Sequence, residues 1–187
     1  MTTYINIFGG PGIGKSTTSA EVFYSMKRTG KNVELVSEVA KGFVWEGRGE
    51  TLQIQPYVLL KQYRDLIRLQ GKVDYVITDS PMLLGVLYGK KINPHLPDSY
   101  FQFIADCHSQ IFTPSINILL KRSFGYSESG RYQTEDEAHQ LDADMKKILD
   151  EKAVDYKEMI PTQVENYVRY STEEHLVEID NSWKETK

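Results

Sequence analysis

The hydrophobic and polar positions of the chain form short apolar runs separated by longer amphipathic stretches. Residues 3–8 are apolar on both faces, and further short apolar runs occupy residues 32–37, 73–79 and 116–121. Runs of this length are typical of strands, and a run that is apolar on both faces is typical of a strand buried within a sheet. Residues 156–160 give a signal of the same kind, so the pattern predicts about five strands.

The stretches between these runs have the spacing of helices. A helix is predicted at residues 15–28, and Gly30 follows as a terminating residue. Further helices are predicted at 52–69, with Pro56 in the first turn, and at 99–112.

A capping-box pattern marks one more helix near the end of the chain. Thr134 and Glu137 have the required spacing, and apolar residues on one face follow them: Ala138, Leu141, Met145, Ile148 and Leu149. No clear element is predicted from residue 162 onward.

Strands that alternate with helices indicate an α/β fold, a three-layer sandwich with a central, mainly parallel sheet. The length of 187 residues fits a single domain over residues 1–187. Ligands of such sheets bind beyond the carboxyl ends of the strands. Three chemically notable features are expected there: a glycine-rich turn after the first strand, Glu38 after the second and Asp79 after the third.

Composition and charge exclude several classes of protein. The net charge of −4 gives no overall electrostatic footprint for nucleic acid. Cys107 is the only cysteine, which excludes an intramolecular disulfide and a zinc site built from several cysteines; we expect a packed thiol. The amino-terminal residues lack the pattern of a signal peptide, and no apolar run is long enough to span a membrane, so a cytoplasmic protein is expected.

The glycine-rich turn carries the strongest motif. Residues 9–16 read GGPGIGKS and match the phosphate-loop pattern G-x-x-x-x-G-K-[ST] in full. A buried strand precedes the motif and an amphipathic helix follows it, which is the context the pattern requires. The motif predicts ATP and Mg²⁺ as cofactors. The expected nucleotide-binding residues are Gly10, Gly12, Ile13, Gly14, Lys15, Ser16 and Thr17.

Individual roles within the loop follow from its chemistry. Lys15 is expected to reach the β- and γ-phosphates, and Ser16 to ligate Mg²⁺ through its hydroxyl. Asp79 is expected to be the second Mg²⁺ residue, as a carboxylate at the end of a strand, although it could also cap the following turn. Glu38 is interpreted as the acid that faces the acceptor hydroxyl; the alternative is an acid that stabilises a helix N-terminus.

Two arginines flank a polar stretch that contains glycine. Arg122 and Arg131 belong to a predicted mobile lid at about residues 122–134. Guanidinium groups on such a lid can close over the phosphates and stabilise the charge of the transferred phosphoryl group. The alternative is a pair of solvated surface arginines.

An aromatic stretch lies between Glu38 and the third strand. A planar acceptor could be held there by stacking and by amide hydrogen bonds. Most aromatic side chains at helical spacing belong to the core, so both interpretations stay open. The residues concerned are Phe43, Trp45, Gln55, Tyr57, Gln62 and Tyr63.

These motifs resemble the small P-loop nucleoside and nucleotide kinases. Within that superfamily the chain is similar to the AAA-like NTPase/kinase group that includes ribosylnicotinamide kinase domains, some of whose relatives occur in bacteriophages. The resemblance rests on IFGGPGIGKST, VSEVAKGF, VITDSP and GRYQTEDEAHQLDADMKKIL. It implies a P-loop NTPase fold, a metal-binding acid at Asp79, an acceptor-side acid at Glu38, and lid arginines at Arg122 and Arg131. Deoxynucleoside kinases typically have an acid-Arg-Ser run after the third strand, whereas Asp79 is followed here by Ser-Pro, which does not favour a plain deoxynucleoside kinase.

The sequence therefore predicts a kinase that passes the γ-phosphoryl group of ATP to a small nucleoside-like or nucleotide-like acceptor. A kinase that modifies 5-hydroxymethyl pyrimidines within DNA is an alternative, which the acidic chain does not favour. A regulatory NTPase that uses ATP as a switch is an alternative of another class. The sequence leaves the oligomeric state open.

Overall fold

The computed structural model describes the backbone of residues 1–123 and 134–184 and the side chains of residues 1–123 and 134–173. Its centre is a five-stranded parallel sheet in the order β2-β3-β1-β4-β5. The strands are β1 (Thr3–Phe8), β2 (Val33–Val36), β3 (Tyr75–Thr78), β4 (Ser115–Leu120) and β5 (Lys157–Met159).

Seven α-helices and two short irregular helices are formed by the described residues. The α-helices are α1 (Lys15–Arg28), α2 (Val39–Trp45), α3 (Gln55–Ile67), α4 (Leu84–Ile92), α5 (Asp98–Asp106), α6 (Glu135–Glu151) and α7 (Pro161–Lys184). A 3₁₀ helix, η1 (Gly49–Gln53), precedes α3, and a π-helical turn, η2 (Cys107–Ile111), continues α5.

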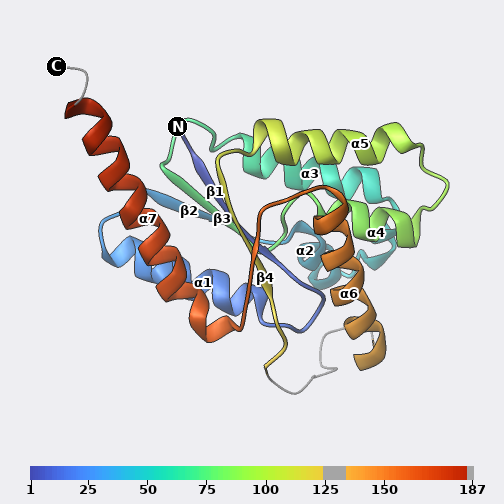
Figure 1. Cartoon of the computed structure of the whole chain (residues 1–187). Helices are drawn as coiled ribbons and strands as arrows, with labels where there is room; N and C mark the ends of the chain where they lie inside the picture. Colours follow the sequence, from blue (N-terminus) through green and yellow to red (C-terminus); the bar gives the residue numbers. More distant parts are fainter. Residues whose placement is uncertain (124–133, 185–187) are drawn as a thin grey trace.

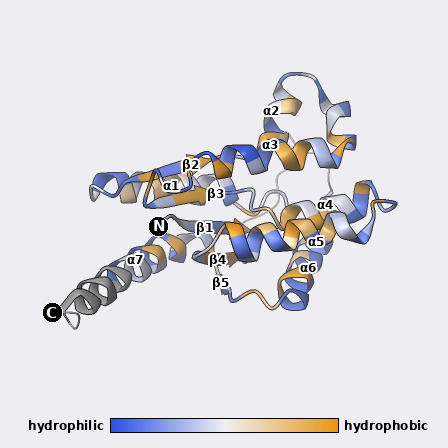
Figure 2. Ribbon diagram, turned by 90° about the horizontal axis from the view of Figure 1, so that it is seen from above, coloured by the Kyte–Doolittle hydropathy of each residue, from blue (hydrophilic) through white to orange (hydrophobic). Residues whose placement is uncertain are grey.

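The helices form a layer on each face of the sheet (Figure 1). Helices α1 and α7 pack together on one face, while α3, α4, α5 and α6 cover the other. The two layers enclose separate apolar clusters, because successive residues of a strand point to opposite faces. In β1, Tyr4 and Phe8 belong to the cluster beneath α3–α6, and Ile5 and Ile7 to the cluster beneath α1 and α7. Figure 2 shows the apolar sides of the helices turned toward the sheet.

The predicted α/β sandwich is thus confirmed, with all five strands parallel. The capping box is present as well: the Thr134 hydroxyl accepts a hydrogen bond from the Glu137 N–H, and the Glu137 carboxylate accepts one from the Thr134 N–H. Every residue of the predicted apolar face of α6 is buried, and so is the Cys107 thiol. Among the described helices none has the combination of length and apolar character needed to cross a membrane.

Two predicted helices differ from the structure. The segment 52–69 is divided at Ile54, because the Gln55 side chain donates to the Leu52 carbonyl and its backbone N–H donates to the Asn93 side chain. Pro56 falls in the first turn of α3, as expected. The segment 99–112 ends in the π-helical turn, in which the Phe112 N–H reaches the Cys107 carbonyl.

Candidate active site

The phosphate loop connects β1 to α1 and is shaped by glycine. Gly14, the residue before α1, has φ 100°, a left-handed conformation that a side chain would strain. Lys15, Ser16 and Thr17 form the first turn of the helix, and the two hydroxyl residues are exposed. The free N–H groups and positive end of a helix N-terminus attract an anion. The Ile13 side chain is buried against Gly9, so this residue can offer only its backbone to a ligand.

Lys15 lies folded over its own loop. Its Nζ atom donates hydrogen bonds of 2.9 Å each to the carbonyl oxygens of Gly9 and Gly10. Burial lowers the pKa of Lys15, and the negative charges of Glu38, Asp79 and Asp142 oppose this effect. The ammonium group therefore interacts electrostatically with three carboxylates from other parts of the fold.

Glu38 and Asp79 come to the same edge of the sheet because their strands are adjacent. β3 pairs directly with both β1 and β2, so the residues after each strand lie side by side. Burial raises the pKa of Glu38; Lys15 opposes the rise, and Asp79 adds to it. Glu38 occupies the N-cap position of α2, but its side chain makes no capping hydrogen bond there. Its carboxylate therefore does not cap the helix, and it interacts electrostatically with Lys15 and Asp79.

Asp79 has the properties of a cation ligand. Only 3% of the residue is exposed, and its Oδ1 atom has no hydrogen-bond partner among the described residues. A buried carboxylate oxygen without a donor is costly unless a cation or an ordered water completes it. Mg²⁺ is typically bound through one or two protein oxygens and the phosphates of its nucleotide. Asp79 and the exposed Ser16 hydroxyl fit this pattern.

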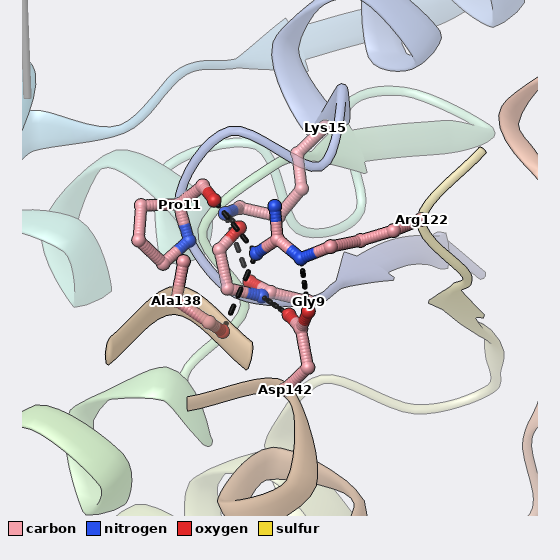
Figure 3. A network of polar contacts seen from close by, with 7 residues as sticks. Gly9, Pro11, Lys15, Arg122, Ala138 and Asp142 are labelled. Carbon is pink, nitrogen blue, oxygen red and sulfur yellow. Dashed lines mark hydrogen bonds and ion pairs between the residues drawn. The ribbon is translucent and has the colours of Figure 1, made fainter. Parts of the chain in front are cut away.

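Arg122 follows β4 and is placed against the phosphate loop (Figure 3). Its Nε atom forms an ion pair of 2.5 Å with Asp142 of α6, and its Nη2 atom donates to the Pro11 carbonyl at 2.8 Å. The other carboxylate oxygen of Asp142 accepts a hydrogen bond of 2.6 Å from the Gly10 N–H. Arg122 therefore lies at the phosphate loop, whereas Arg131 and most of the predicted lid at residues 122–134 lie outside the described residues.

Two residues that the sequence did not single out belong to this arrangement. Asp142 is one, and Tyr88 of α4 is the other: burial raises the pKa of Tyr88, and the charges of Glu38 and Asp142 raise it further. The phenol is thus electrostatically coupled to both acids. Asp142 lies four residues after the buried Ala138, within the apolar face of α6, and a charge at such a position was a signal in the sequence.

The aromatic stretch does not form a single pocket. Phe43 is buried and packs against Tyr57 with ring centroids 5.8 Å apart, whereas Trp45 is 77% exposed. Tyr63 packs on Phe112 in the core beneath α3–α6. Of these residues, Phe43 of α2 and Tyr57 of α3 contact each other.

The two glutamines are also engaged within the protein. Gln62 is buried; its amide oxygen accepts a hydrogen bond from the Val39 N–H, and its amide nitrogen reaches the Thr78 hydroxyl at 3.5 Å. Gln55 holds the break between η1 and α3. These amides are therefore occupied by structural contacts.

A hollow of about 250 Å³ lies at the amino-terminal ends of the strands, opposite the phosphate loop. Its lining includes Thr3, Tyr75 and Ser115, which are the first residues of their strands, together with Tyr167 and Thr172 of α7. The phosphate loop and the acids follow the last residues of the strands. The hollow is therefore separate from the candidate active site.

The strand order and the phosphate loop between β1 and α1 define a P-loop α/β fold. The chain is similar to the solved structure of deoxyadenosine kinase from M. mycoides with bound dATP, with a TM-score of 0.53 and 16% identity over 91% of this chain and 99% of that chain. The same kinase with dCMP and dCDP bound matches over the same shares, at 17% identity and a TM-score of 0.53.

The NadR protein in complex with NR is similar too, with a TM-score of 0.57 and 14% identity over 84% of this chain and 45% of that chain. No family model matches the sequence, and no curated protein does. The predicted resemblance to P-loop nucleoside kinases is confirmed at the level of the fold.

Proposed function

We propose that this protein is an ATP-dependent kinase that transfers the γ-phosphoryl group to a hydroxyl of a nucleoside-like or nucleotide-like acceptor. The observation that carries the proposal is that Glu38 and Asp79 follow strands adjacent to β1 and interact electrostatically with Lys15 of the phosphate loop. The two acids have different surroundings and suit two tasks: Asp79 would bind the metal, and Glu38 would accept the proton of the acceptor hydroxyl.

In this proposal Lys15 leaves the carbonyls of Gly9 and Gly10 and binds the β- and γ-phosphates. Asp79 and Ser16 hold Mg²⁺, which supplies charge neutralisation of the phosphates when bound. Glu38 accepts the proton of the acceptor hydroxyl as the new phosphorus–oxygen bond forms and the bond to the ADP oxygen breaks. Burial makes this carboxylate more basic, and the charge of Lys15 favours its ionised form.

The acceptor class is supported by the fold and by the chemistry of the surroundings. The similar solved structures are proteins with nucleosides or nucleotides bound. The net charge of −4 does not favour a long polyanion such as DNA as the acceptor.

A panel assay with γ-labelled ATP tests the proposal directly. The acceptors are nucleosides, nucleoside monophosphates, nicotinamide riboside and hydroxymethyluracil-containing DNA, each with Mg²⁺. We expect label in a small acceptor. Label in DNA alone would identify the alternative kinase, and release of free phosphate without transfer to any acceptor would contradict kinase activity and favour the ATP switch.

A further inference from the structure

Asp142 connects α6 to the phosphate loop through both of its carboxylate oxygens. Oδ1 accepts from the Gly10 N–H at 2.6 Å, and Oδ2 pairs with Arg122 Nε at 2.5 Å. The side chains of Asp142 and Arg122 are 20% and 12% exposed, so the pair is largely removed from solvent. Arg122 completes the connection by donating to the Pro11 and Ala138 carbonyls (Figure 3).

The glycine at position 10 is explained by this contact with α6. The phosphate-loop pattern leaves position 10 unspecified, and Gly10 is not among the glycines with positive φ, so neither the motif nor the backbone requires a glycine here. A Cβ atom at this position would lie 2.6 Å from Asp142 Oδ1 and 3.0 Å from the Ala138 carbonyl oxygen. The close approach of α6 is therefore what requires a glycine at position 10.

The contact places two cations on neighbouring residues of the loop. Lys15 Nζ is anchored on the Gly10 carbonyl, and Arg122 Nη2 on the Pro11 carbonyl. The positive charge of Arg122 is close enough to disfavour the charged form of Lys15, while Asp142 favours it. The carboxylate thus holds a guanidinium beside the phosphate-binding lysine and offsets the repulsion between them.

We infer that Asp142 is a positioning residue for phosphoryl transfer, which fixes Arg122 on the phosphate loop beside Lys15. This inference rests on the proposed function. It assigns to Asp142 two opposite effects: its negative charge weakens the binding of the ATP triphosphate, and its hold on Arg122 speeds the transfer.

Asp142→Asn separates these effects, because asparagine keeps an oxygen for the Gly10 N–H and removes the charge that pairs with Arg122. We expect ATP to bind about three- to tenfold more tightly, because one negative charge near the triphosphate is lost. We expect kcat to fall by about 10- to 100-fold, because the guanidinium is no longer fixed. A loss of folded protein would lower the active fraction without tightening ATP binding.

The matched control is Asp144→Asn. Asp144 lies on the same helix and accepts a hydrogen bond from Gln140 at 2.9 Å on the exposed side. It should change neither ATP affinity nor kcat by more than about twofold. Asp142→Glu is the second variant: it keeps the charge, so ATP affinity should return to the wild-type value even if kcat recovers only in part.

Arg122→Ala tests whether Asp142 acts through Arg122. In that background Asp142→Asn should lower kcat by less than about twofold more, since there is no guanidinium left to position. A kcat loss that persists in full, or equal ATP affinities in Asp142→Asn and Asp144→Asn, would overturn the inference. ATP affinity is measured by calorimetry without an acceptor, so failure of the wild-type protein to transfer phosphate would sink the kinase proposal separately.

Discussion

The side-chain oxygen of Gln62 accepts a hydrogen bond of 3.1 Å from the backbone N–H of Val39. Val39 is the first residue of α2 and follows Glu38, while the amide nitrogen of the same glutamine reaches Thr78, the residue before Asp79. One buried side chain therefore connects the backbone N–H of Val39, next to Glu38, with the side-chain hydroxyl of Thr78, next to Asp79.

Replacement of Gln62 by leucine should disturb the position of Glu38. The Val39 N–H would lose its partner, and an unsatisfied group at this site costs about 1–3 kcal/mol of unfolding free energy. We expect a roughly tenfold lower kcat in the folded variant, with ATP affinity nearly unchanged. Urea unfolding and steady-state kinetics measure the two effects. Gln70→Leu removes a comparable but exposed bond to the Ile111 carbonyl and serves as the control; equal effects in both variants would count against the positioning of Glu38.

Lys15→Met should lower the rate of phosphoryl transfer by about 10³-fold or more, because the γ-phosphate loses the ammonium group proposed to bind it. The fold should tolerate the change, since two hydrogen bonds are lost but a buried charge is removed as well. We expect a melting temperature within about 3 °C of wild type and no further rise on addition of Mg-ATP. Lys27→Met, at the far end of α1, should keep the nucleotide-dependent rise. Retention of that rise in Lys15→Met would contradict the assigned nucleotide site.

Glu38→Gln should separate catalysis from nucleotide binding. If the carboxylate takes the proton of the acceptor, kcat should fall by about 10²- to 10⁴-fold, while the dissociation constant for ATP changes by less than about threefold. Isothermal calorimetry and a transfer assay give the two values. Glu34→Gln, in β2 and paired with Lys27 at the surface, is the control. A comparable loss of ATP binding and turnover would show that Glu38 acts on the nucleotide instead.

His108 should make the stability of the protein depend on pH. Burial beside Phe8 lowers the pKa of His108 to about 4, so the folded protein holds this imidazole neutral. The unfolded chain binds the proton near pH 6.5, so the stabilisation is complete above about pH 6.5 and is lost as the pH falls toward 4. The loss amounts to about 2–3 kcal/mol by pH 4.5.

The comparison of wild type with His108→Gln in urea measures this effect. Their difference in unfolding free energy should shrink by about 2–3 kcal/mol between pH 7 and pH 4.5. His139→Gln, which changes an exposed histidine, should leave the wild-type pH dependence intact. Parallel stability curves for wild type and His108→Gln would mean that the buried imidazole does not titrate in this range.

Local patterns were sufficient to predict the strands of the sheet and the position of the phosphate loop between β1 and α1. The strands are short, apolar and β-rich, and the phosphate loop is a contiguous motif whose backbone conformation depends on its own glycines. The capping box likewise needs only Thr134 and Glu137 to define the start of α6. In each case the residues that determine the structure are near one another in the chain.

The helices that were missed depend on distant contacts. α4 contains Gly85 and Gly89, which lower its helix propensity, yet Gly85 gives room to Leu59 of α3 and Gly89 to Phe101 of α5. α7 begins at Pro161, a residue suited to a first helical turn, but its burial against α1 is a tertiary effect. The role of Asp142 could not be predicted for the same reason, since its partner Gly10 lies 132 residues away.

The position of β2 at the edge of the sheet has a consequence for how this protein could acquire new acceptors. Residues 38–67, from Glu38 through α3, connect this edge strand to the region before β3. The phosphate loop instead follows β1, the central strand of the sheet. Under the proposed function, substitutions in residues 38–67 can change the acceptor surface while the central strands preserve the ATP site. Under the proposed function, selection on the acceptor and selection on the phosphate donor act on different stretches of the chain, so specificity can diverge without a new fold.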